Sequence, residues 1–321
     1  MLININNILS RLPKNWLGVV QVTAAATLWG TSATLAKHLF NNSISAFDVA
    51  QMRLTLSFIL LVLVLSISKP GLLRVRKSDL GYLAMFGIVG LGLLQFTYLL
   101  ALSSTNVATA LFLQYMAPII ILIFGLLLGT EVLTGMKLLA LSAAIIGGYL
   151  IVVGTTSGFG LNPVGVMYGL ASACTFAFYS MYGKRGLKIY NSWTLLAWGM
   201  GFGSLVWCLY QSPWTLAMRY GGLAWLQFLY IAVIATILPF GLYIKGLQNL
   251  SAFRAGMIGM LEPVVGAVSA FFFLGELLTL TQMLGSSLIL LGVAMLQINA
   301  REQSDERVYP QQELSLREGG K

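Results

Sequence analysis

One acidic residue lies near the middle of a long apolar segment of this chain. Glu262 is followed by Pro263, which has no backbone N–H and therefore frees the carbonyl of Gly259 one turn earlier. A carboxyl group beside a free carbonyl can bind a cation, a substrate rich in hydrogen-bond donors, or a proton. Ionisable groups inside a membrane span are costly and usually functional, so we expect Glu262 to bind substrate or carry charge. The alternative is a protonated Glu262 that only bonds a neighbouring helix.

Arg53 is the second charged candidate, six residues into another apolar segment. A guanidinium does not lose its proton in a protein, so it needs an acid, carbonyl groups or a water-filled cavity. Asp48 begins the same segment and could cap it while reaching Arg53. Substrate binding and a purely structural role are equally good interpretations of Arg53.

Aromatic and amide side chains in several apolar segments could complete a binding pocket. Such walls with a few polar groups suit an amphipathic organic molecule or a cationic amine. The candidates are Trp29, Gln95, Tyr98, Gln114, Tyr115, Tyr179 and Trp198, with Tyr243 as a further aromatic. Gln95 and Tyr98 are three positions apart and share a helix face. Tyr98 and Tyr243 lie near segment ends, so anchoring at the membrane interface is an alternative for both.

Other residues predict helix geometry and exclude some kinds of chemistry. Pro118, Pro239 and Pro263 fall inside apolar segments and predict kinks. Glu131 and Glu276 suit the first turns of the helices that follow them, although Glu276 could also close an outer gate. The single histidine, the absence of a Walker loop and the absence of cysteine pairs at metal spacing predict neither metal nor cofactor. Transport would then run on a gradient, by exchange, or by facilitated diffusion.

These residues lie in a chain built for a lipid bilayer. Hydrophobic residues make up 58% of its 321 positions and charged residues 9%. A spanning helix needs about 20 apolar residues, and ten segments qualify. They run over 17–36, 47–68, 80–102, 106–128, 133–153, 163–183, 192–211, 222–243, 253–274 and 279–299. We therefore expect an all-α membrane protein with ten transmembrane helices.

The net charge of +9 reflects membrane orientation and not nucleic-acid binding. Basic residues gather between segments on one side, whereas the other side receives only Lys37 and Arg219. The positive-inside rule then places both termini in the cytoplasm. We expect 1–16 to be a cytoplasmic or interfacial N-terminus and 300–321 a disordered cytoplasmic tail.

The second half of the chain repeats the first. Gly18, Ala26, Lys37 and Ser45 match residues 147 positions later, at Gly165, Ala173, Lys184 and Ser192. Tyr98, Pro118, Glu131, Thr134 and Gly147 match residues 145 positions later, at Tyr243, Pro263, Glu276, Thr279 and Gly292. Five helices per copy would place the copies, 17–155 and 162–299, upside down relative to each other. Such inverted repeats are typical of alternating-access transporters.

The chain resembles the ten-helix, EamA-type members of the drug/metabolite transporter superfamily over about residues 17–299. The resemblance is carried by Ala26-Thr27-Leu28-Trp29-Gly30, by Arg53, and by two stretches from Pro118 to Thr134 and from Pro263 to Thr279. It implies inverted five-helix repeats in the inner membrane and a central cavity lined by helices 1–4 and 6–9, with helices 5 and 10 peripheral. It also implies, most often, efflux of metabolites such as amino acids, although members include importers of small cationic compounds.

The sequence therefore favours a multi-pass secondary transporter that exports a small organic metabolite, an amino acid or a related amphipathic compound. A choline-like importer or facilitator, a membrane enzyme acting on lipids, and a non-transporting receptor or scaffold are the alternatives. A monomer is plausible because one chain contains both halves of a pathway. Residues where the two copies differ are the first candidates for the substrate site: Glu262 matches Ala117, Arg53 matches Met200, and Pro239 matches Leu94.

Overall fold

The long apolar segments of the sequence form helices in a computed structural model, which describes residues 13–41, 44–155, 162–274 and 278–298. Within these ranges the chain contains helices and connecting turns and no strand. The first copy contains α2 (Lys14–Asn41), α3 (Ala46–Ser68), α4 (Leu80–Gly87), α5 (Leu94–Ser104), α6 (Val107–Gln114), α7 (Ala117–Leu127) and α8 (Gly135–Val153). The second contains α9 (Pro163–Gly186), α10 (Ser192–Tyr210), α11 (Pro213–Arg219), α12 (Gly222–Ala232), α13 (Leu238–Asn249), α14 (Ala252–Gly259), α15 (Leu261–Leu274) and the helix Leu280–Ile298.

Seven helices among the described residues are long and apolar enough to cross a membrane, which makes the chain a multi-pass membrane protein. They are Phe47–Ser68, Lys77–Ser104, Val107–Leu127, Gly135–Val153, Pro163–Gly186, Ala224–Asn249 and Leu280–Ile298. The other three expected spans correspond to α2, to α10 and to the pair α14 and α15. Those three are helical but are not among the seven, so a count of ten spans stays a prediction.

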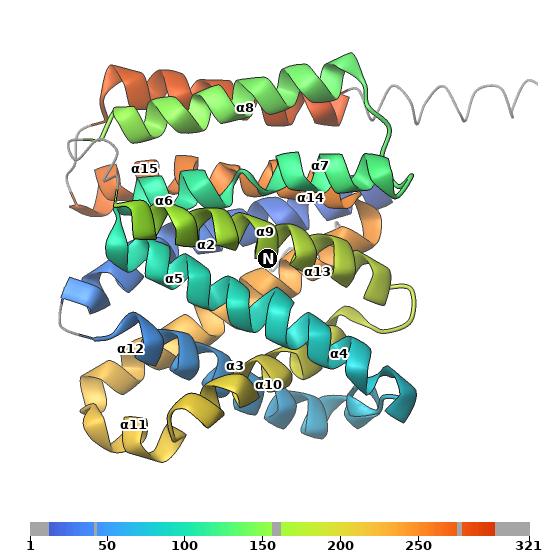
Figure 1. Ribbon diagram of the computed structural model, residues 1–321, viewed down its shortest axis with the longest axis vertical. Coiled ribbons are helices and arrows are strands. Elements are labelled where there is room, and N and C mark those ends of the chain that lie inside the picture. The colour runs from blue at the N-terminus through green and yellow to red at the C-terminus, as the bar shows by residue number, and fades with distance from the viewer. Residues whose placement is uncertain (1–12, 42–43, 156–161, 275–277, 299–321) are drawn as a thin grey trace, which may run out of the picture.

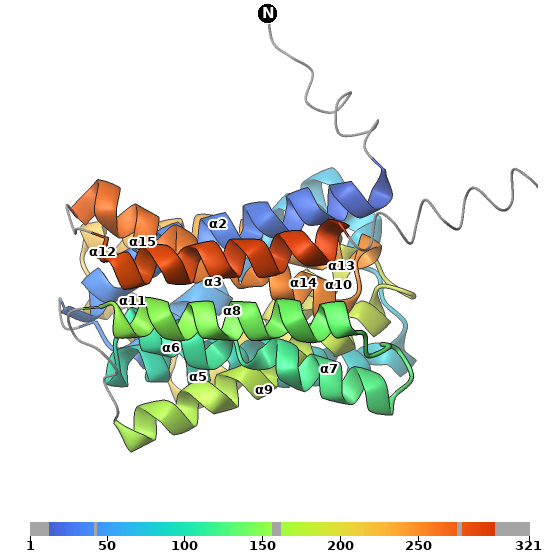
Figure 2. The same cartoon turned by 90° about the horizontal axis from the view of Figure 1, so that it is seen from above.

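The helices are stacked in layers (Figure 1). The helix pair α8 and Leu280–Ile298 forms a separate layer at one end, and Figure 2 shows the two helices side by side. They approach closely because glycines face each other: a Cβ on Gly147 would come within 2.5 Å of the Gly285 carbonyl oxygen. The predicted N-terminal segment 1–16 is described only from residue 13, and the predicted tail 300–321 lies outside the described residues.

The central helices of one copy pack against those of the other in a reciprocal pattern. In the first copy α2 packs against α13 and α15, and in the second copy α9 packs against α5 and α7. Likewise α3 packs against α12, while α10 packs against α4. Each copy therefore completes its core with the other, which places a shared centre between them.

Both copies contain a π-helical segment at the same position. In the first copy η3 (Ile88–Leu93) joins α4 to α5, and in the second η4 (Val233–Ile237) joins α12 to α13. The two segments begin 145 positions apart, the offset of the repeat in this region. Pro239 follows the second segment, but the first has Leu94 at the matching position and forms a π segment without proline. The π geometry is thus a property of the repeat, and π segments are frequent at functional sites.

Both copies also interrupt one helix near its middle. The first break, at Tyr115 and Met116, separates α6 from α7, and the second, at Met260, separates α14 from α15. Pro118 and Pro263 each follow such a break by two or three residues, and the kinks that the sequence predicted at these prolines stay a prediction. Both prolines lie in the first turn of α7 and α15, where a missing N–H leaves no helical bond unmade.

Candidate functional site

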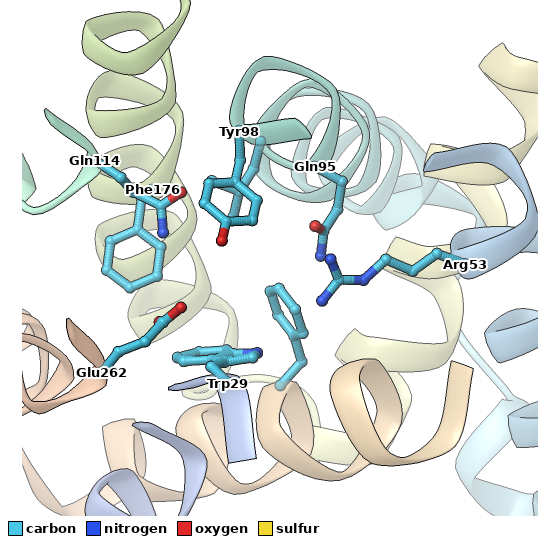
Figure 3. Close-up of a pocket in the computed structure, with 9 residues that line it drawn as sticks. Trp29, Arg53, Gln95, Tyr98, Gln114, Phe176 and Glu262 are labelled. Atoms are coloured by element: carbon cyan, nitrogen blue, oxygen red, sulfur yellow. The ribbon is translucent and has the colours of Figure 1, made fainter. Parts of the chain in front are cut away.

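A small cavity lies where the central helices of the two copies meet (Figure 3). Its volume is about 30 Å³, room for roughly two water molecules. Pockets for organic ligands are usually ten or more times larger, at about 300–1,000 Å³, so the cavity is contracted in this conformation. Its walls are made by Trp29, Arg53, Leu94, Gln95, Tyr98, Gln114, Phe176, Phe240 and Glu262.

Glu262 lies at the start of α15, two residues after the break at Met260, with its side chain facing the cavity (Figure 3). It is 4% exposed, and the Tyr115 hydroxyl donates a hydrogen bond of 2.6 Å to its Oε2. The carboxyl therefore bonds a neighbouring helix and also faces the cavity. Gly30 allows this arrangement, because a Cβ there would come within 2.6 Å of the Glu262 carbonyl oxygen.

Arg53 approaches the cavity from the opposite side, on α3. Its Nε donates to Thr236 Oγ1 at 2.7 Å, and its Nη2 donates to the Ala235 carbonyl at 2.6 Å. Both acceptors belong to the π segment η4. A guanidinium has five N–H donors, so these two bonds anchor Arg53 and leave others for the cavity. The structural and the substrate-binding interpretations are therefore compatible.

The expected contact between Asp48 and Arg53 is wrong. The Asp48 carboxylate instead accepts hydrogen bonds from Arg219 Nη1 at 3.0 Å and from the Tyr220 hydroxyl at 2.5 Å. Asp48 lies more than a turn before Arg53, at the end of α3 that meets the α11–α12 connection, whereas Arg53 reaches inward to η4. Ser45 caps α3, because its Oγ accepts from Phe47 N.

Two further cavity residues carry N–H groups without a partner among the described residues. The Trp29 Nε1 and Gln95 Nε2 atoms are buried and make no hydrogen bond there. In Figure 3 the indole nitrogen is at the end of Trp29 toward Arg53, and Gln95 lines the same cavity. The Tyr98 hydroxyl also points into the cavity. Gln114 Oε1 is already used, because it accepts from Ser172 Oγ at 2.7 Å.

Aromatic rings form the apolar wall of the cavity. Trp29 packs edge-to-face against Phe240, with ring centroids 4.9 Å apart, and against Phe176 at 6.3 Å. Phe176, Phe240 and Leu94 also line the cavity and were not predicted from the sequence. Phe176 and Phe240 each lie three positions before a tyrosine that was predicted, on the same helix face, so the spacing that paired Gln95 with Tyr98 could have found them.

Three of the predicted aromatic residues lie outside the cavity wall. Tyr115 donates a hydrogen bond to Glu262, and Tyr179 packs against Phe240 and Tyr243. Trp198 lies at another end of the fold, where its Nε1 donates to the Leu73 carbonyl at 3.1 Å. Anchoring of Tyr98 or Tyr243 in the membrane interface is wrong, because Tyr98 faces the cavity and Tyr243 is fully buried.

The sequence predicted that Glu131 would lie in the first turn of α8, but Glu131 precedes that helix and does not cap it. Thr134 caps that helix, accepting from Lys137 N, while Glu131 forms an ion pair of 2.6 Å with the Lys137 ammonium group. Glu131 also packs against Gly125, so the turn folds back on the end of α7. Glu276, its match in the second copy, lies outside the described residues.

Equivalent helices of the two copies each bind the connection that follows the equivalent helix in the other copy: α3 binds the segment after α10, and α10 binds the segment after α3. Gln51 on α3 donates from Nε2 to the Gln211 carbonyl at 2.6 Å, beside Asp48. Its match 147 positions later is Trp198 on α10, which binds the Leu73 carbonyl, while Thr194 donates to Leu72. We name these contacts the Asp48 cluster (Asp48, Gln51, Gln211, Arg219 and Tyr220) and the Trp198 cluster (Leu72, Leu73, Thr194 and Trp198).

Known proteins share both the sequence pattern and the fold. Residues 16–153 and residues 163–298 each match the EamA-like transporter family. The chain is 29% identical over 291 residues to a Salmonella typhimurium protein named uncharacterized inner membrane transporter YicL. The matched region covers 89% of this chain and 97% of that protein. The chain is also 25% identical over 294 residues to the Escherichia coli threonine/homoserine exporter RhtA, covering 90% and 94%. A solved crystal structure has the same fold, with a TM-score of 0.72, 19% identity, and coverage of 89% and 98%.

Proposed function

The chain belongs to the EamA-like transporter family, and from that premise we propose that it is a secondary transporter of the inner membrane that exports a small amphipathic metabolite, an amino acid or a close relative. The substrate occupies the central cavity, and the two five-helix copies move against each other to expose it to each side in turn. Similarity to a threonine/homoserine exporter supports both the amino acid and the direction of transport.

The observation that carries this proposal is the pair of opposite charges at the cavity. Arg53 and Glu262 are 7% and 4% exposed, and neither forms an ion pair within the described part of the chain. Buried charges without a counter-ion are expensive, so their retention at a shared cavity supports a role in binding. A scaffold protein would gain nothing from such an arrangement.

The contracted cavity supports alternating access. About 30 Å³ does not hold an amino acid, so the copies must separate around the cavity before substrate binds. Reciprocal packing provides the surfaces for such a movement, because each copy contributes helices to the other's core. A rigid-body movement of one repeat against the other then changes the cavity without unfolding either copy.

The test is transport by purified protein in liposomes. Counterflow of labelled amino acids, with threonine and homoserine included, is expected for the wild-type chain. Proton-driven uptake into inside-out vesicles is expected to fail in Glu262→Gln, which keeps the size of the side chain but cannot carry a proton. Elution as a single species separates this loss from misfolding. Unchanged coupling in Glu262→Gln would exclude the proton role, and absence of counterflow for every compound would exclude the proposed function.

A second candidate is transport of a small cationic amine. It is favoured by an acidic side chain beside aromatic rings, since Glu262, Trp29 and Phe176 could together surround a quaternary ammonium group. Choline and related quaternary amines in the same counterflow assay decide between the two candidates. Arg53 argues against it, because a cationic substrate would share the cavity with a buried guanidinium.

A further inference from the structure

The polar groups of the cavity are divided between two sides. Arg53, Gln95 and Trp29 form what we call the donor side, where an anchored guanidinium lies with two buried N–H groups that lack partners among the described residues. Buried donors left unpaired cost free energy, and native proteins rarely retain them without a reason. Three convergent donors, one of them charged, are the chemistry that binds a carboxylate.

The opposite side of the cavity carries the complementary charge. The Tyr115 hydroxyl donates to Oε2 of Glu262, and Oε1 accepts no hydrogen bond from the described residues. That oxygen is therefore available to a cationic donor from a substrate. Figure 3 shows Glu262 and Arg53 on opposite walls with the cavity between them. The spacing of the two charges across one small cavity matches a molecule that carries both signs.

The two sides also come from different copies of the repeat. Trp29, Arg53 and Gln95 belong to the first copy, and Glu262 belongs to the second. Arg53 also joins the two copies directly, because it donates hydrogen bonds to η4 of the second copy. A ligand that bonds the donor side and Glu262 at once would bridge the two copies at the point where they separate.

We propose that the cavity selects zwitterions: the donor side binds the carboxylate of an α-amino acid, and Glu262 binds its ammonium group. This inference rests on the proposed function and names the substrate class of the same site. Closure around a cation leaves the donor side unpaired, and closure around an anion leaves Glu262 unpaired. Only a zwitterion satisfies both sides when the copies close, so the cavity rejects substrates of either single charge.

The wild-type protein provides the first test, without any substitution. Counterflow in liposomes is measured for L-serine, L-threonine and L-methionine, each beside its amide, which lacks the carboxylate, and its 2-hydroxy acid, which lacks the ammonium group. Loss of a hydrogen bond to a charged group corresponds to about ten-fold or more in affinity. We expect the amide and the hydroxy acid to compete at least about ten-fold more weakly than the parent amino acid.

Substitutions on the donor side assign the carboxylate to particular residues. Trp29→Phe keeps the aromatic ring and removes the N–H, and Gln95→Leu removes the amide at similar size. Each substitution is expected to lower the apparent affinity for the amino acid several-fold and to leave the affinity for its amide unchanged. The preference for the amino acid over its amide therefore falls. Trp225→Phe, which removes an indole N–H outside the cavity, is the matched control and is expected to keep the wild-type preference.

The outcomes separate this inference from the proposed function. If amino acids are transported but their amides compete equally well, the zwitterion inference is wrong and the proposed transport function still holds. Amides or quaternary amines that outcompete amino acids would overturn it in favour of the cationic candidate. If no compound of the panel undergoes counterflow, the proposed function fails and the zwitterion site fails with it. A preference that falls equally in Trp225→Phe would show that the effect is not at the donor side.

Discussion

At the scale of single residues, the support of Glu262 by Tyr115 decides whether the carboxyl is usable. The tyrosine lies at the break between α6 and α7, the carboxyl two residues after the break between α14 and α15, and their hydrogen bond joins the two interrupted helices. Both groups are buried, so a partner lost on one side is not replaced by bulk water. The bond therefore holds the acidic side of the cavity in place.

Replacement of Tyr115 by Phe is expected to lower the free energy of unfolding by about 1–3 kcal/mol, the cost of a buried polar group left without its partner. Transport should fall with it, because Glu262 loses its orientation. Thermal unfolding of the purified variant in detergent measures the first effect and counterflow the second. Tyr179→Phe is the matched control, since that hydroxyl lies 3.5 Å from its acceptor, the Phe240 carbonyl. Equal losses in both variants would contradict a special role for the bond to Glu262.

At the scale of helices, the sequence predicted where segments lie better than how they are built. Apolar runs fix the beginning and end of α3 and α8 within two residues of the expected ranges, because burial in lipid requires continuous apolar length. The π segments and the helix breaks were not predicted, because an apolar run indicates the length of a helix and not its internal hydrogen-bond pattern. The charged candidates Arg53 and Glu262 were found because ionisable groups are rare in such a chain, whereas Phe176 and Phe240 were hidden among many apolar rings.

Close helix crossings show why glycine is needed at particular positions. A Cβ on Gly87 would come within 2.5 Å of the Gly199 carbonyl oxygen and 2.7 Å of the Phe202 Cβ, so α4 and α10 meet through their backbones. The carbonyl and Cβ atoms cannot move aside as the end of a flexible side chain could. The crossing also packs α10 against η3, and therefore positions the π segment that leads into α5.

Gly87→Ala is expected to destabilise the protein by about 1–3 kcal/mol, the usual cost of overpacking. Gly81→Ala in the same helix is the matched control, because no atom lies within 4 Å of its added Cβ. Alanine there should be neutral or stabilising by up to about 1 kcal/mol. Thermal unfolding of the two variants side by side measures the difference. A Gly87→Ala protein as stable as Gly81→Ala would mean that the two helices can separate without cost.

At the scale of the whole molecule, the Asp48 and Trp198 clusters close the fold at matching positions of the two copies. Each ties the second long helix of one copy, α3 or α10, to the connection that follows the same helix in the other copy. The contacts differ in kind: the Asp48 cluster contains an ion pair, and the Trp198 cluster contains neutral hydrogen bonds. Both clusters are formed in this conformation, in which the cavity has a volume of only about 30 Å³.

Loosening one cluster should therefore open the cavity toward one side. Tyr98→Cys, in a background with Cys174→Ser and Cys208→Ser, reports on access of a membrane-impermeant maleimide to the cavity. Asp48→Asn is expected to raise labelling in intact cells, and Trp198→Phe to raise it in inside-out vesicles, because positive-inside topology places the Asp48 cluster outside. Loss of a hydrogen bond worth about 1 kcal/mol shifts a two-state population about five-fold, which sets the expected increase. If both variants opened the cavity toward the same side, the two clusters would not close opposite sides of an inverted repeat. If each variant opened the side opposite to the expected one, the clusters would still close opposite sides, but the predicted orientation of the chain in the membrane would be reversed.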